Sequence, residues 1–149
     1  MTVQQAYSEN ATSILDTQTL ADVATLFVDA NCSDLMIIQE DQSFVGICSE
    51  GDLIRKTMFK YSDMRTEGLS RDEMFEIYLK KSDGMAKTTV MDIATTNPIT
   101  ITRDTPLAKA ASYMVSKNIR RLPVVEDGKL IGVLSRALAV KAIFEHGEK

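Results

Sequence analysis

The chain is poor in the residues that most catalytic and metal sites use. It has no tryptophan, one histidine and two cysteines among its 149 residues. Cys32 and Cys48 stand far apart and outside any C-x-x-C spacing, so we expect two reduced thiols and no bound metal. Because the G-x-x-x-x-G-K-[ST], H-E-x-x-H and G-x-S-x-G motifs are missing, the sequence predicts a protein that is not an enzyme and has no catalytic residue.

Long apolar runs and long runs of like charge are also lacking. Residues 1–10 are polar and contain no basic region followed by an apolar stretch, so we expect no leader, no membrane span and a cytoplasmic location. The net charge of −4 is spread over 17 basic and 21 acidic residues. This balance argues against a nucleic-acid partner but leaves room for a local basic cluster that holds one small anion.

What the chain does contain is an internal repeat. The segment 20–28 recurs as the segment 107–115, an offset of 87, with apolar residues in the same places. The second copy is one residue shorter in a later hairpin, so that Ser49 matches Ser135 at an offset of 86. Self-similarity at a near-constant offset indicates two copies of one supersecondary unit.

Both copies predict the same order of elements. An extended stretch opens each copy, a helix with one apolar face follows, and two short apolar runs precede a closing helix capped by Ser49 or Ser135. The opening stretches are residues 11–15 and 98–102; the apolar runs are 35–38 and 44–48, then 122–125 and 130–134; the helix faces are Leu20, Val23, Ala24, Phe27 and Val28, then Leu107, Ala110, Ala111, Met114 and Val115. We therefore expect an α+β fold in which two β-α-β-β-α repeats pack sheet against sheet as a pseudo-twofold pair.

The chain divides into three segments within one module of residues 1–149. The first repeat covers residues 1–58, a helical insertion covers 59–88, and the second repeat covers 89–149. Within the insertion, Ser70 and Glu73 form a capping-box pattern at the start of a helical run through Leu79. Residues 66–69 and 82–87, each with one glycine, are predicted to be the loops on either side of that run.

Two motifs within this repeat frame carry a resemblance to a known family. Residues 46–52 read G-I-C-S-E-G-D and residues 120–125 read R-R-L-P-V-V. Together with the order of elements, they closely resemble the tandem CBS-domain pair, or Bateman module, of the stand-alone bacterial type. The resemblance implies a cleft between the repeats that holds AMP, ADP, ATP or S-adenosylmethionine, a homodimer paired through the helices, and a partner protein regulated by occupancy of the cleft.

The residues of this chain can be assigned to such a ligand. Asp52, three residues after Ser49 at a helix start, can accept both vicinal hydroxyls of a ribose. Arg120 and Arg121 offer planar guanidinium groups that match a phosphate. The resemblance groups these residues in one cleft and implies that the segment Pro98, Ile99 and Thr100 reads the base through its backbone, with Pro123 as a wall. Arg136, at the start of the last helix, is a further candidate for the phosphate.

The mirror-related cleft lacks the corresponding ribose acceptor and phosphate donors. Its serine is present as Ser135, but Leu138 takes the place of Asp52, and Ser33 and Asp34 take the places of the two arginines. A leucine side chain cannot accept a hydrogen bond from a ribose hydroxyl, and an aspartate carboxylate repels phosphate. We therefore predict one occupied nucleotide site per chain.

Other interpretations of these residues stay open. Ser49 and Asp52 also form a helix cap that needs no ligand, and the arginine pair can be solvated charge between a helix and a strand. The leading hypothesis is a regulatory adenine-nucleotide-binding module. The alternatives are a dimerisation or scaffold module with empty clefts and a nucleotide hydrolase without a recognised motif.

Overall fold

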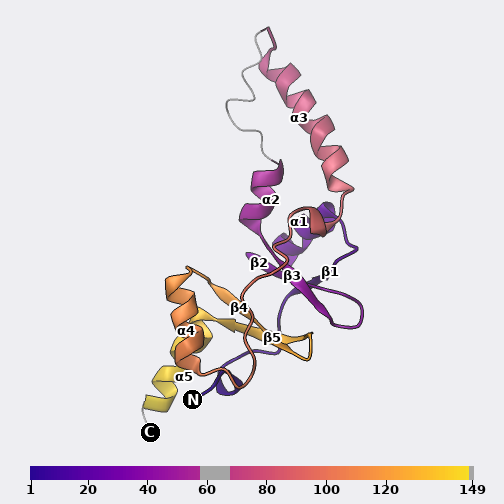
Figure 1. Cartoon of the computed structure of the whole chain (residues 1–149). Coiled ribbons are helices and arrows are strands. Elements are labelled where there is room, and N and C mark those ends of the chain that lie inside the picture. The colour runs from indigo at the N-terminus through magenta and orange to yellow at the C-terminus, as the bar shows by residue number, and fades with distance from the viewer. Residues whose placement is uncertain (58–67, 148–149) are drawn as a thin grey trace.

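The computed structural model describes residues 1–57 and 68–147, so residue 58 and the first part of the predicted insertion lie outside the described residues. The first repeat contains β1 (Ser13–Leu15), α1 (Leu20–Asp29), β2 (Asp34–Ile38), β3 (Phe44–Ser49) and α2 (Glu50–Thr57). Its sheet has the order β1-β2-β3, with β1 parallel to β2 and β3 antiparallel to it. This is the predicted β-α-β-β-α order (Figure 1).

The second repeat has the same order except at its start. It contains α4 (Leu107–Ser116), β4 (Arg121–Glu126), β5 (Lys129–Ser135) and α5 (Arg136–Gly147), and β4 and β5 form a two-stranded antiparallel sheet. The strand predicted at 98–102 is reduced to one parallel bridge between Ile101 and Val124. The α+β prediction is confirmed; the first opening strand is shortened from 11–15 to Ser13–Leu15, and the second is reduced to this single bridge.

Proline explains the shortened strand. In the first repeat, the backbone N–H of Met36 donates to the Thr12 carbonyl at 3.0 Å and extends the parallel pairing toward the N-terminus of β1. The equivalent residue in the second repeat is Pro123, which has no N–H to donate to Ile99. The parallel pairing therefore stops at Ile101, whose N–H still donates to the Pro123 carbonyl at 3.0 Å.

Each repeat contributes its first segment to the other repeat. A 3-10 turn at η1 (Val3–Gln5) leads to Ser8, which bridges Val133 on β5, and the equivalent turn at η3 (Val90–Asp92) leads to Thr95, which bridges Ile47 on β3. Gly46 makes the second crossing possible, because a Cβ at this position would overlap the Thr95 carbonyl oxygen. The two repeats are thus joined by exchanged segments related by a pseudo-twofold axis.

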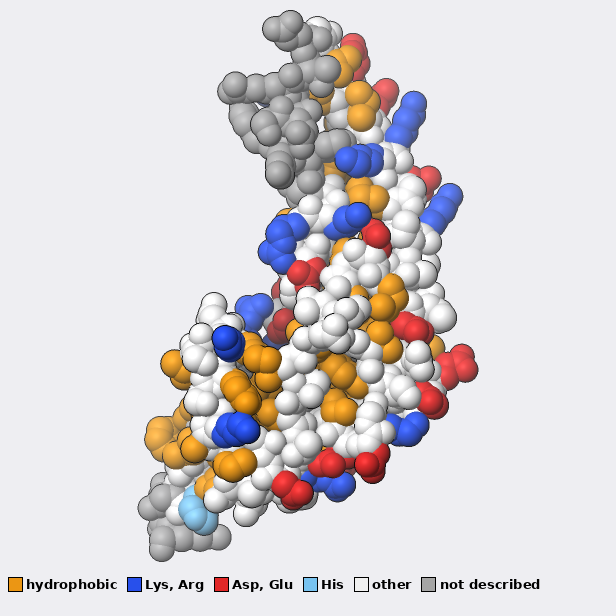
Figure 2. All heavy atoms as spheres, in the orientation of Figure 1, with side chains coloured by type: hydrophobic (Ala, Val, Ile, Leu, Met, Phe, Trp, Pro, Cys, Tyr) orange, Lys and Arg blue, Asp and Glu red, His pale blue; other side chains and the backbone are white. Residues whose placement is uncertain are grey.

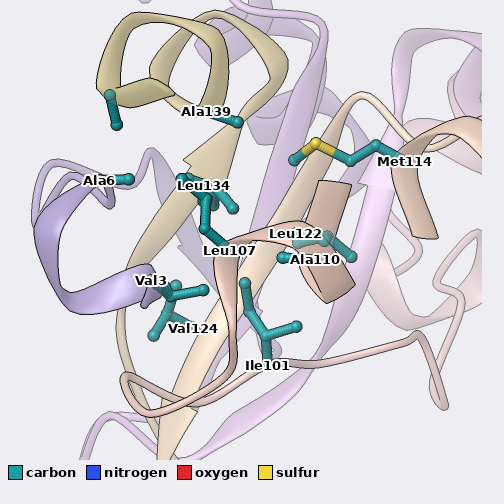
Figure 3. Packing of buried hydrophobic residues seen from close by; sticks show 11 residues of the cluster. Val3, Ala6, Ile101, Leu107, Ala110, Met114, Leu122, Val124, Leu134 and Ala139 are labelled. Carbon is teal, nitrogen blue, oxygen red and sulfur yellow. The ribbon is translucent and has the colours of Figure 1, made fainter. Parts of the chain in front are cut away.

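The buried side chains follow the same exchange. Val3 and Ala6, from the start of the chain, pack with second-repeat residues such as Leu107, Leu122 and Leu134 (Figure 3). Val90 in turn lies in the first-repeat core. A third cluster joins the two sheets and consists of Met36, Ile38, Leu130 and Val133. Because each repeat completes the core of the other, we expect neither to fold well alone.

The helices α1 and α4 bury only part of the predicted apolar faces. Leu20, Val23 and Phe27 are buried on α1, and Leu107, Ala110 and Met114 on α4. Val28 and Val115, which occupy equivalent positions, are 79% and 85% exposed. The prediction of a fully buried face is therefore wrong for the last position of each stripe and also for Ala24, which is exposed.

The helix of the insertion, α3 (Arg71–Ala86), is capped by Ser70, whose side chain accepts from the Glu73 N–H at 3.2 Å. The predicted loop at 82–87 is wrong, since α3 continues through Gly84 to Ala86, as a helix can with one interior glycine. None of its residues is buried. Figure 1 shows α3 extending away from both sheets.

Candidate functional site

Asp52 lies in the first turn of α2 and already has two protein partners. Its Oδ2 accepts from the Ser49 N–H at 2.8 Å, while the Ser49 Oγ accepts from the Asp52 N–H at 3.2 Å, so the predicted capping box is formed. Its Oδ1 lies 2.6 Å from Nη2 of Arg55, an ion pair that was not predicted from the motif. A carboxylate has about four acceptor positions, so this one retains capacity for ribose hydroxyls.

Arg121 and Arg120 do not point freely into solvent. Nη1 of Arg121 donates to Oδ2 of Asp34 at 2.7 Å and to the Ser33 hydroxyl at 3.1 Å. Nη2 of Arg120 lies 3.9 Å from Oδ1 of the same carboxylate. Asp34, predicted to lie in the mirror-related cleft, instead lies against the two arginines proposed for phosphate.

These four residues lie beside the pseudo-twofold axis. Asp34 begins β2 and Arg121 begins β4, at equivalent positions of the two repeats, and Ser33 and Arg120 precede them. The contacts are reciprocal, since Ser33 touches Arg121 and Arg120 faces Asp34. Residues that meet their own symmetry equivalents in this way must flank the axis. One charge cluster is therefore shared between the repeats.

The segment predicted to read a base connects the two halves of the candidate site. It leaves β3 at the bridge between Thr95 and Ile47, close to the point where β3 ends and α2 begins, and it reaches β4 at the bridge between Ile101 and Val124. It thus connects β3, which precedes the Asp52 helix, with β4, which begins at Arg121. Pro98 and Ile99 are half-buried within it, and Thr100 is exposed.

The backbone of this segment is available for a ligand. Among the described residues, Pro98, Ile99 and Thr100 make no hydrogen bond with one another or with any neighbour. Strands that continue their pairing would use these groups, as Thr12 does in the first repeat. Pro123 therefore has a specific effect here, because its missing N–H leaves the Ile99 carbonyl without a strand partner.

The remaining two predicted residues have other surroundings. The side chain of Pro123 is fully buried, so a wall at this position would require the chain around it to move. Arg136 points to the end of α4: its Nε donates to the Ile119 carbonyl at 3.0 Å and its Nη2 to the Asn118 Oδ1 at 3.0 Å. These bonds give Arg136 a capping role for α4, and phosphate binding by it stays a prediction.

The two cysteines lie near the same cluster. Burial raises the pKa of Cys48 to about 12, and the Asp52 and Asp34 carboxylates add to the effect. Burial also raises the pKa of Cys32, although the Arg121 charge opposes this. Both are free thiols that stay protonated near neutral pH and are therefore weak nucleophiles. Within residues 1–57 and 68–147, no group of three or more His, Cys, Asp or Glu residues could hold a metal ion.

No helix in the described parts of the chain is both long enough and apolar enough to cross a membrane. Figure 2 shows Lys and Arg side chains interspersed with Asp and Glu over the visible face, without a field of one sign.

Comparison with solved structures shows the same architecture elsewhere. The crystal structure of CBSX2 in complex with AMP superposes with a TM-score of 0.73 at 25% identity, and it covers 98% of each chain. Another crystal structure of CBSX2, a CBS-pair protein from Arabidopsis thaliana, gives a TM-score of 0.75. The CBS domain pair of MJ0100, in complex with 5′-methylthioadenosine and S-adenosyl-L-methionine, matches at 0.66 with 22% identity and shares the fold.

Sequence comparison gives relatives of the same kind. The chain is 32% identical over 135 residues to Uncharacterized protein MJ1426 of Methanocaldococcus jannaschii, covering 83% of this chain and 80% of that protein. It is 30% identical to the CBS domain-containing protein CBSX1, chloroplastic, of Arabidopsis thaliana, of which it spans 57%. The family model of the CBS domain matches twice, at residues 3–58 and 90–145. The chain therefore belongs to the CBS domain family and carries two CBS domains in tandem.

Proposed function

We propose that this protein is a regulatory module that binds one adenine nucleotide of the AMP, ADP or ATP type between its two repeats and signals occupancy to a partner protein. The observation that carries this proposal is the unpaired backbone of residues 98–100, a segment that leaves β3 at the Thr95–Ile47 bridge and reaches β4 at the Ile101–Val124 bridge. A base edge needs unpaired N–H and C=O groups, which this segment offers. The AMP complex of the similar CBSX2 supports the ligand class, and S-adenosylmethionine is a further candidate.

The charges support a single nucleotide per chain. In the proposed site, Asp52 accepts the ribose hydroxyls and the two arginines donate to the phosphate. In the mirror-related position, Ser135 caps α5 through the Leu138 N–H, and the leucine side chain packs on the second core. A hydrocarbon side chain cannot accept a ribose hydroxyl, so that cleft is not expected to bind.

The capping role of Asp52 complicates a simple mutational test, but the chain offers a matched control. Asp22 forms the same reciprocal cap on α1, where its Oδ2 accepts from the Thr19 N–H at 3.0 Å and its own N–H donates to the threonine hydroxyl at 3.2 Å. Removal of either carboxylate takes away one hydrogen bond to the backbone N–H of the N-cap residue, a loss of about 0.5–1.5 kcal/mol. Only Asp52 lies at the proposed cleft.

Isothermal titration calorimetry with AMP, ADP, ATP and S-adenosylmethionine tests the proposal. We expect one bound nucleotide per chain, a loss of affinity of at least about tenfold in Asp52→Ala, and unchanged affinity in Asp22→Ala. Equal losses in both variants would assign Asp52 to capping alone. If none of the four compounds binds to the unmodified protein at millimolar concentration, the dimerisation or scaffold function would replace the proposed one.

A further inference from the structure

The least expected feature of the site is a carboxylate inside its phosphate-binding half. We propose that Asp34 determines how many phosphate charges the nucleotide site accepts. It forms an ion pair with the guanidinium group of Arg121 and disfavours ligands with many phosphate charges. This inference rests on the proposed function, since it concerns which member of the adenylate series the same site prefers.

The geometry is that of a satisfied anion site. Oδ2 of Asp34 lies 2.7 Å from Nη1 of Arg121, and its other oxygen faces Arg120 at 3.9 Å. The Ser33 hydroxyl accepts from the same Nη1 at 3.1 Å and donates to Oδ2 of Asp34 at 3.1 Å. Two guanidinium groups and one hydroxyl around one anion are the donors that a phosphate oxygen would use, so the carboxylate stands where that oxygen would bind.

Burial strengthens the contact. The Asp34 side chain is 18% exposed, whereas the side chains of Arg121 and Arg120 are 38% and 59% exposed. Solvent therefore screens the carboxylate less than the arginines, and the arginines keep surface for a second anion. Asp34 also begins β2 opposite Ser49, so its backbone is held by the strand pair and cannot move away.

The charge balance predicts the direction of the specificity. The two arginines and Asp34 together carry one net positive charge, which suits a ligand with few phosphate charges better than one with many. Each added phosphate charge gains attraction from the arginines but also meets repulsion from Asp34. Affinity should therefore rise weakly, or fall, from AMP to ATP in the unmodified protein.

A competing explanation is that the Asp34–Arg121 pair only ties the two repeats together. In that case its removal would lower stability and would affect all nucleotides alike. A charge-specific role instead predicts an effect that grows with the number of phosphates and vanishes for adenosine. The two explanations thus differ in a binding series and not in a single affinity.

The test is Asp34→Asn, which keeps the size and a hydrogen-bond acceptor for Arg121 but removes the charge. Titration with adenosine, AMP, ADP and ATP without Mg²⁺ should show unchanged adenosine binding, a gain of about threefold for AMP and a gain of at least about tenfold for ATP. Asp104→Asn, an exposed change of equal charge before α4, is the matched control. Asp34→Ser serves if the asparagine variant does not fold, as judged by circular dichroism.

The outcomes separate the two proposals. If the nucleotides bind but the gain does not increase with phosphate number, or Asp104→Asn gives the same increase, the specificity role of Asp34 is overturned while the nucleotide function stands. If neither the unmodified protein nor the variants bind any of the four compounds, both proposals fail.

Discussion

Pro123 stands where the first repeat has a residue with a backbone N–H, and this difference concerns the proposed nucleotide site. Pro123 corresponds to Met36, whose N–H donates to the Thr12 carbonyl at 3.0 Å. Because proline cannot make this bond, the carbonyl of Ile99 keeps its capacity to accept a hydrogen bond. The pairing of β4 with β5 loses no hydrogen bond, since Pro123 and Val133 form a non-hydrogen-bonded pair. The proline thus removes a hydrogen bond only on the side of β4 that faces the segment 98–101.

This leads to a prediction for Pro123→Ala. The new N–H can donate to the Ile99 carbonyl and extend the parallel pairing, so we expect adenine-nucleotide affinity to fall by about threefold to tenfold while stability stays within about 1 kcal/mol of the unmodified protein. Calorimetry and urea unfolding measure the two quantities. An unchanged affinity would show that the Ile99 carbonyl does not read the base, and a large loss of stability would show that the ring itself is needed for packing.

The residue scale is also where the sequence was least informative. The spacing of Ser49 and Asp52 correctly predicted a reciprocal cap, because a cap depends on residues three apart in one segment. The contact between Asp34 and Arg121 joins residues 87 positions apart, and no local pattern contains it. The repeat offset did mark the two as equivalent, but that they meet at the axis follows only from how the repeats pack.

At the scale of elements, sequence patterns predicted the helices and strands well and their burial less well. Apolar periodicity found α1 and α4 but also marked Val28 and Val115, which are exposed in the fold. The opening strand of the second repeat was predicted from its likeness to the first, yet one missing N–H reduced it to a bridge. Element type follows from local pattern, whereas element length depends on the partner strand.

The insertion helix α3 differs from the other long helices because it has no buried residue. An isolated helix of this length is marginal in water, since most helical stability in proteins comes from packing of an apolar face. The side chain of Phe75, 59% exposed, stacks on Tyr78 of the same helix and not on either core. We therefore expect α3 to open independently of the two repeats.

Hydrogen exchange followed by mass spectrometry tests this expectation. Amides of α3 should be protected at least about a hundredfold less than those of α1, which buries Val23 and Phe27. Phe75→Ala should change the free energy of unfolding by less than about 0.5 kcal/mol, whereas Phe27→Ala should lower it by about 3–5 kcal/mol. Equal protection of the two helices would mean that α3 is held by contacts outside the described residues or by another molecule.

At the scale of the whole molecule, exposed apolar side chains occupy equivalent positions in the two repeats. Val28 and Val115 are equivalent, as are Ile54 on α2 and Val140 on α5, and all four are more than about a third exposed. Phe144 on α5 is 68% exposed and borders a surface hollow with Val140. Figure 2 shows hydrophobic side chains gathered where α4 and α5 lie. The helices of both repeats thus carry unpartnered apolar surface at matching places.

We propose that a second copy of the chain covers this surface and that the protein is a homodimer paired through its helices. A symmetric partner suits the arrangement, because a twofold interface brings the same patch of each copy together and the pseudo-twofold fold presents that patch once per repeat.

Size-exclusion chromatography with light scattering should give twice the mass of one chain. Val140→Glu with Phe144→Glu should give the mass of one chain, since burying two added carboxylates without partners is unfavourable. Phe75→Glu, an equally exposed aromatic on α3, should leave the dimer intact. A single-chain mass for the unmodified protein at all concentrations tested would exclude the homodimer, and dissociation by the Phe75 variant alone would move the interface to the insertion helix.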